Sequence, residues 1–94
     1  NRVELATKIT KSTNIPELKN YKFWVVDISI SIYLDRISHQ KYTFIANSAL
    51  GFFYNDNFHT LGKYVIQIDR DGKVTLMGEA VDQNYIKVSI YGIY

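Results

Sequence analysis

Large apolar side chains occupy every second position between residues 24 and 34 of this chain. These positions are Trp24, Val26, Ile28, Ile30, Ile32 and Leu34. The alternate positions include Asp27, Ser29 and Ser31, and Asp35 continues that register directly after Leu34. Because side chains along a β-strand point alternately to its two faces, the spacing predicts a strand with one buried and one solvated face. Strands of this kind are typical of antiparallel sheets with one side toward water, so we expect a chain rich in β-structure.

Weaker alternation marks four more segments as strands. They cover residues 41–50, 63–69, 74–78 and 85–94. Asp71-Gly72 is the strongest hairpin signal, because glycine accepts the positive φ that a tight turn requires. The apolar positions of these segments are expected to form one core, made of Trp24, Val26, Ile28, Ile30, Ile32, Phe44, Tyr64, Ile66, Ile68, Val74, Leu76, Ile86, Val88 and Ile90.

The N-terminal segment, residues 2–12, fits two interpretations. As a strand it places Leu5 and Ile9 on one face, and as a helix it stacks the same two residues one turn apart. We favour the helix, because a single sheet needs an element that covers its dry face. Proline and glutamate within residues 14–18 indicate a further short turn of helix.

Together these segments predict an α+β domain in which a five-stranded antiparallel, mostly meander sheet curls around a short N-terminal helix. The alternative is a small β-barrel, closed or nearly closed, to which residues 2–12 contribute a sixth strand. The chain has 94 residues and no linker or internal repeat. Residues 1–94 are therefore expected to form a single domain that needs most of its apolar side chains for one core.

Composition and motifs argue against most kinds of chemistry. The chain has no cysteine, which excludes disulfides and thiolate metal sites, and its formal net charge is +2, with basic residues scattered along the sequence. Nucleic acid is therefore not an expected partner, and no apolar run is long enough to span a membrane. No nucleophile, phosphate-loop or metal-ligand motif occurs, so we expect no enzyme activity, no cofactor and no metal.

Three polar features have ordinary structural interpretations. Asp69–Gly72 has the spacing of the start of a calcium loop, but it lacks the downstream ligands and suits a hairpin turn. His39 and His59 lack the spacing of a zinc motif. Asp27 is the acid within the most apolar strand, and it either points outward and pairs with a cross-strand lysine or is a buried acid with a raised pKa.

The best candidate for a binding site is the aromatic segment 51–59, which is expected to be a loop. Its four rings, around a polar tip, are Phe52, Phe53, Tyr54 and Phe58. Either the loop packs its own rings, or some of them remain exposed as a partner site.

The C-terminal strand is a second candidate. Tyr91 and Tyr94 lie on or near its surface register. If the strand lies at a sheet edge, its free backbone groups could accept a strand of another chain. Alternatively, it is an interior strand that is paired on both sides.

These observations favour a non-catalytic protein-binding or assembly domain, whose partner is another protein or a second copy, in a cell-surface, envelope or viral structure outside the cytoplasm. The helix-then-sheet order also suggests a pilin-like subunit, by architectural analogy only. The alternative is a small barrel that binds single-stranded nucleic acid or carbohydrate through exposed rings such as Tyr33, Phe53 and Tyr91. A deep pocket holding both histidines, or Asp27 with a second acid, would indicate an enzyme instead.

Overall fold

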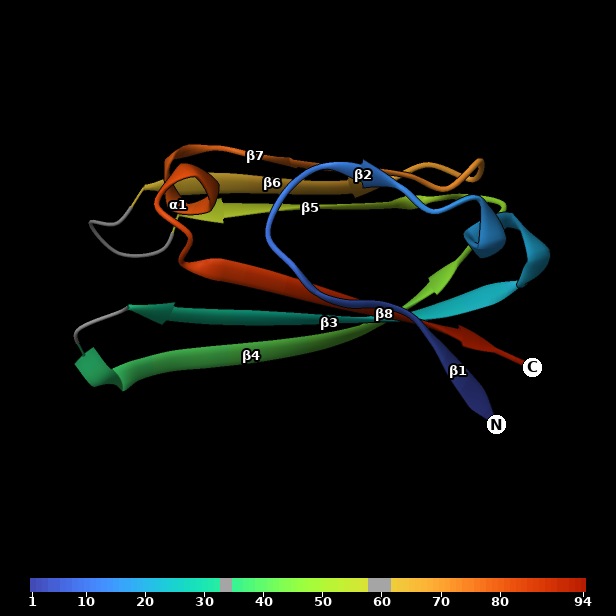
Figure 1. The fold of residues 1–94 in the computed structure, drawn as a ribbon, viewed down its shortest axis with the longest axis horizontal. Coiled ribbons are helices and arrows are strands. Elements are labelled where there is room, and N and C mark those ends of the chain that lie inside the picture. The colour runs from blue at the N-terminus through green and yellow to red at the C-terminus, as the bar shows by residue number, and fades with distance from the viewer. Residues whose placement is uncertain (33–34, 58–61) are drawn as a thin grey trace.

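Two antiparallel sheets of four strands each stack face to face in the computed structural model (Figure 1). The structure describes residues 1–32, 35–57 and 62–94. In chain order, the elements are β1 (Arg2–Ile9), β2 (Thr13–Asn14), the 3-10 helix η1 (Pro16–Asn20), β3 (Phe23–Ile32), β4 (Asp35–Asn47), β5 (Phe52–Asn57), β6 (Lys63–Ile68), β7 (Lys73–Met77), α1 (Glu79–Asp82) and β8 (Ile86–Ile93). The fold is a β-sandwich. The predicted α+β meander around a helix is therefore wrong, and so is the barrel, because the described strands form two separate sheets.

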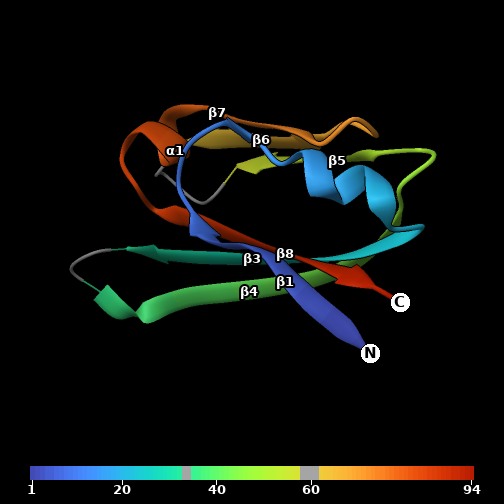
Figure 2. The same cartoon turned by 45° about the vertical axis from the view of Figure 1, so that its right-hand side comes forward.

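The chain passes repeatedly between the two sheets. The first sheet has the strand order β1-β8-β3-β4, and the second has the order β2-β7-β6-β5. After β1, the chain crosses to β2, returns for β3 and β4, and crosses again to form the β5–β7 meander (Figure 1 and Figure 2). α1 then leads back to β8, which inserts between β1 and β3. A single meander is wrong because successive segments belong to different layers.

The N-terminal segment is a strand, so the helix favoured for it is wrong. β1 pairs antiparallel with β8, and Ala6 is its one fully buried residue. The expectation of a helix rests on the need to cover a dry sheet face, and the second sheet covers that face instead. The helix-then-sheet order behind the pilin analogy is thus absent from the described part of the chain. The short helical turn predicted for residues 14–18 is present as η1, slightly later in the sequence.

The predicted alternation in β3 is confirmed. Trp24, Val26, Ile28 and Ile30 are at most 1% exposed, whereas Ser29 on the opposite face is only partly buried. The other predicted core positions that are buried are Tyr64, Ile66, Ile68, Val74, Leu76, Ile86, Val88 and Ile90. Both sheets contribute to this list, so the core lies between them. Of the remaining two positions, Phe44 is partly buried and packs against the core. The side chain of Ile32 lies outside the described structure.

The core also contains residues that alternation does not identify. Leu18 of η1 is fully buried, and its carbonyl oxygen accepts a 2.8 Å hydrogen bond from Trp24 Nε1. Ala80 and Val81 of α1 are buried as well. The two short helices lie at opposite ends of the sandwich (Figure 2), so they close the two ends of the core.

Two strands differ from their predicted extents. Residues 35–40, expected to be a polar connection, form the first part of β4, which is 13 residues long. Residues 52–57, expected within a loop, form β5. The turn-forming residues 55–57 are extended because they pair in register with β6, and this non-local pairing outweighs their local preference.

Candidate functional site

Aromatic rings fill the side of the sandwich where β4 and β5, the last strands of the two sheets, lie over one another. This aromatic cluster consists of Tyr42, Phe44, Phe52, Tyr54 and Tyr64. Ring centroids are 4.9 Å apart for Phe44–Tyr54 and 6.4 Å apart for Tyr42–Phe44. Such distances are typical of favourable offset and tilted aromatic pairs. The cluster therefore closes the core at this side.

Two tyrosine hydroxyls of the aromatic cluster form a chain that leads to the surface. Tyr64 donates a hydrogen bond to Tyr54, whose hydroxyl lies 3.5 Å from Asp56 Oδ2. Burial raises the pKa of Tyr64 far above its ordinary value of 10.0, and burial is also the main reason that the pKa of Tyr54 is raised. Both hydroxyls therefore stay neutral near pH 7, and they suit structural hydrogen bonding better than proton abstraction.

The structure describes three of the four rings predicted as a partner site, and it places them on two faces of the second sheet. Phe52 and Tyr54 belong to the aromatic cluster and pack against the core. Phe53 points to the opposite face of the second sheet and is 62% exposed. Phe58 lies outside the described residues. A role for any of these residues in partner binding stays a prediction.

Tyr91 lies in β8 and Tyr94 directly follows that strand. β8 is paired with both β1 and β3, so it is the interior strand and not an open edge. Tyr91 points to the outer face, where the Arg2 guanidinium carbon lies 4.5 Å from its ring centroid. Burial raises the pKa of Tyr91, and the nearby Glu4 carboxylate raises it further. Tyr94 is 72% exposed, so binding by either residue would use its side chain and not a free strand edge.

The first sheet has two edge strands, β1 and β4. β1 is 8 residues long and its register with β8 shifts twice, whereas β4 is 13 residues long, so β4 is the longer open edge. The Ser31 N–H donates a 2.9 Å hydrogen bond to the Tyr85 carbonyl, on the β8 side of β3. Because backbone groups of successive residues point to opposite sides, the even-numbered residues of β3 bond to their even-numbered register partners in β4. Odd-numbered residues of β4 therefore direct their N–H and C=O groups outward, where no described strand lies. In the regular part of β4 these are Lys41, Thr43 and Ile45.

β4 has a lysine, Lys41, in its regular part and one shift in its register with β3, but it is otherwise an unprotected edge. It is 13 residues long and has no proline, and Ile45 is 73% exposed. By contrast, β5 is 6 residues long, and Asp56 Oδ1 accepts a 2.7 Å hydrogen bond from the Asn57 N–H. A long and partly apolar edge is a template for pairing with another strand.

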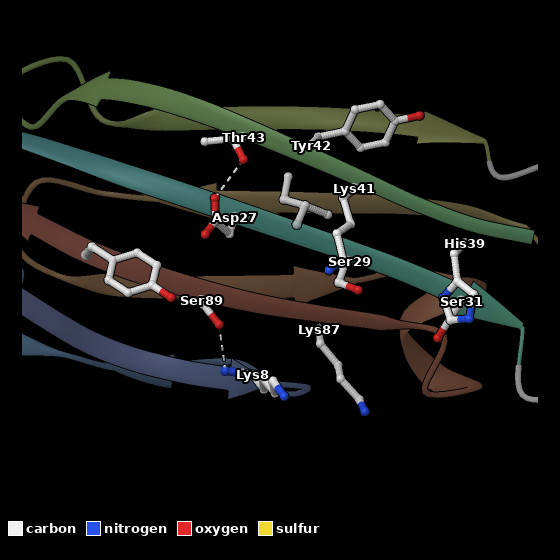
Figure 3. Close-up of a pocket in the computed structure, with 12 residues that line it drawn as sticks. Lys8, Asp27, Ser29, Ser31, His39, Lys41, Tyr42, Thr43, Lys87 and Ser89 are labelled. Carbon is white, nitrogen blue, oxygen red and sulfur yellow. Dashed lines mark hydrogen bonds between the residues drawn. The ribbon is translucent and has the colours of Figure 1, made fainter.

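A depression of about 720 Å³ lies on the outer face of the first sheet (Figure 3). In its middle row, Ser29 of β3 has Lys41 of β4 and Lys87 of β8 as register partners. In the next row, the Thr43 hydroxyl donates a 2.8 Å hydrogen bond to the Asp27 carboxylate. Asp27 is therefore partly exposed on the outer face, but it pairs with a threonine and not with the lysine expected from the sequence.

Among the residues that the structure describes, the other polar features named from the sequence are not gathered into a metal site. His39 is exposed beside the depression, and His59 lies outside the described residues. Asp69–Gly72 is the predicted turn, in which the Asp69 carboxylate accepts 2.9 Å hydrogen bonds from the N–H groups of Asp71 and Lys73. Across residues 1–32, 35–57 and 62–94, no group of three metal-binding side chains occurs.

Comparison of the chain with protein-family models, with curated proteins and with solved structures finds no match. In the described part of the chain, neither short helix has the length and apolar character needed to cross a membrane. The open β4 edge and the polar depression are therefore the two features from which function can be argued.

Proposed function

We propose that the chain is a non-catalytic assembly domain in which β4 pairs with β4 of a second copy. This pairing would extend the first sheet across both molecules. The proposal is supported by the length of β4 and by its outward backbone groups, which have no strand partner among the described residues. Each such N–H and C=O is a hydrogen-bonding group that an added strand would satisfy.

An antiparallel pair centred on Thr43 gives complementary neighbours. Thr43 then faces its own equivalent, and Lys41 faces Ile45 of the second copy, so no like charges are opposed. The apolar stem of Lys41 covers Ile45, which is 73% exposed in the single chain. On the inner side, Tyr42 faces Phe44 of the second copy, so the aromatic cluster continues across the boundary.

Analytical ultracentrifugation over a series of protein concentrations tests the proposal. The unsubstituted chain should show a monomer–dimer transition, and Thr43→Pro should be monomeric throughout. Proline removes an outward N–H but no bond to β3, so circular dichroism should show an intact fold. Thr43→Val is the matched control, because it loses the hydroxyl but keeps the N–H, and it should dimerise.

A second variant keeps the test informative if Thr43→Pro does not fold. Ile45→Lys opposes Lys41 of the second copy with a like charge and should weaken dimerisation at least about tenfold. A chain that stays monomeric up to millimolar concentration would overturn the proposal. Dimers that persist in both folded variants would also overturn it.

A further inference from the structure

The depression on the outer face of the first sheet has more basic than acidic side chains. Lys8, Lys41, Lys87 and His39 line it, against the single carboxylate of Asp27. None of the three lysines forms an ion pair with a described residue. The carboxylate already accepts a hydroxyl hydrogen bond within the sheet. The uncompensated charge at this surface is therefore positive.

A bulge in β1 brings Lys8 to the depression. Between its pairs with Ile90 and Val88, β1 has one residue more than β8, which puts Lys8 opposite Ser89. Lys8 has a φ of 46°, a left-handed conformation that is unfavourable for a non-glycine residue. Its N–H donates a 2.9 Å hydrogen bond to Ser89 Oγ, which holds the bulge in place (Figure 3). Bulges of this kind redirect side chains and are frequent beside binding sites.

The shape and polarity of the depression suit an extended ligand rich in hydroxyl groups. It crosses all four strands of the sheet, and small hydroxyl side chains line it together with the basic ones (Figure 3). These side chains are Ser29, Ser31, Thr43 and Ser89. Two tyrosines also line it, but the Tyr42 ring packs within the aromatic cluster and Arg2 lies over the Tyr91 ring. The surface therefore lacks the free stacking rings on which single-stranded nucleic acids bind.

We infer that this depression binds an acidic polysaccharide. The lysines contact its carboxylate or sulfate groups, and the serine and threonine hydroxyls form hydrogen bonds with the sugar hydroxyls. This binding function goes beyond assembly through β4 and does not require it. Lys41 lies on β4, but Lys8 and Lys87 lie on β1 and β8, which β3 separates from that edge.

Isothermal titration calorimetry with defined polymers tests the inference. Polygalacturonate supplies carboxylates and dextran sulfate supplies sulfates, and comparison of the two identifies the preferred acid. Neutral dextran and poly(dT) complete the set. We expect at least one of the acidic polysaccharides to bind, with an affinity that falls as salt concentration rises. We also expect neutral dextran not to bind and poly(dT) to bind more weakly.

Charge-neutral variants locate the binding surface. Lys41→Gln and Lys87→Gln should each weaken the affinity about threefold, and the double variant about tenfold. Lys73→Gln removes the same charge from β7 in the other sheet and is the matched control, which should bind as the unsubstituted chain does. An equal loss of affinity in Lys73→Gln would show that binding depends only on the net charge of the protein, and it would overturn the inference. The absence of binding to both acidic polysaccharides, or tighter binding of poly(dT), would also overturn it.

Discussion

The two long sides of the sandwich differ in how their backbone edges are covered. On one side, β2 pairs with β7, and the Ser12 hydroxyl continues the pairing. Ser12 Oγ accepts a 2.9 Å hydrogen bond from the Leu76 N–H and donates a 3.2 Å hydrogen bond to the Leu76 carbonyl. On the other side, aromatic rings fill the core, but no described strand covers the outward backbone groups of β4.

The difference separates two properties of a sheet edge. A side chain that replaces a neighbouring strand stabilises the single molecule and prevents further pairing. An uncovered edge contributes nothing to the single molecule but stays available to another strand. Substitutions on the β1/β2 side should therefore change the free energy of unfolding, and substitutions along β4 should mainly change association.

The largest effect is expected at Gly72, on the covered side. The Ile15 N–H donates a 2.8 Å hydrogen bond to the Gly72 carbonyl, and a Cβ at position 72 would lie 2.1 Å from the Ile15 carbonyl oxygen. Gly72→Ala should lower the free energy of unfolding by about 3 kcal/mol in urea titrations, because φ is also positive there. Asp71→Ala, in the same turn, should change it by less than about 0.5 kcal/mol. Equal effects of the two substitutions would show that the contact between Ile15 and Gly72 contributes little to stability.

Removal of the Ser12 hydroxyl should have the next largest effect. Ser12→Ala leaves both backbone groups of Leu76 without their partner and should cost about 1.5 kcal/mol. Hydrogen exchange at the Leu76 amide should accelerate accordingly. Ser12→Thr retains the hydroxyl and should keep most of the stability. Unchanged protection in Ser12→Ala would mean that the hydroxyl does not act as a substitute strand.

Alkaline pH should destabilise the side that contains the aromatic cluster. Because burial raises the pKa of Tyr64, the folded chain keeps a proton that the unfolded chain releases near pH 10. The free energy of unfolding should therefore be unaffected at neutral pH and fall as the pH rises through 10. The loss attributable to Tyr64 should reach about 1 kcal/mol at pH 11. Tyr64→Phe should show a shallower fall in urea titrations, whereas Tyr94→Phe, at a 72% exposed position, should follow the unsubstituted chain.

The smallest effect on stability is expected at Phe53, on the outer face of the second sheet. Its ring is 62% exposed, so Phe53→Ser should change the free energy of unfolding by less than about 0.5 kcal/mol. If dimerisation uses β4 alone, sedimentation of this variant should match that of the unsubstituted chain. Loss of the dimer in Phe53→Ser would instead move the interface to the predicted aromatic site.

The sequence predicts those parts of the fold in which burial is a local property. β3, β6, β7 and β8 have regular alternation, so their buried faces follow from spacing alone. β1 and β5 do not, because their structure depends on partners far away in the chain. Periodicity shows that Ile28 and Ile66 are buried, but it does not show that they belong to different sheets.

Prediction of the two candidate sites would also have required the register and the order of the strands. The row of Lys41, Ser29 and Lys87 can be recognised only when the register of three strands is known. Nothing in the spacing of positions 29, 41 and 87 along the chain indicates it. The open edge likewise depends on strand order, which places β4 and not the C-terminal strand at the end of the sheet. The exposed aromatic residues, by contrast, could be named from composition without any knowledge of what they contact.

The position of β8 between β1 and β3 determines when the first sheet can form during synthesis. β1, the first of the described strands in chain order, has β8, the last of them in chain order, as its one neighbour in the described sheet. Until β8 is synthesised, β1 has no strand to pair with, and one backbone edge of β3 has no partner. The domain is therefore expected to fold after translation of residues 86–93, and contacts of such large sequence separation form slowly. A nascent chain that stalls before this point would expose its apolar surfaces to chaperones and to other nascent chains.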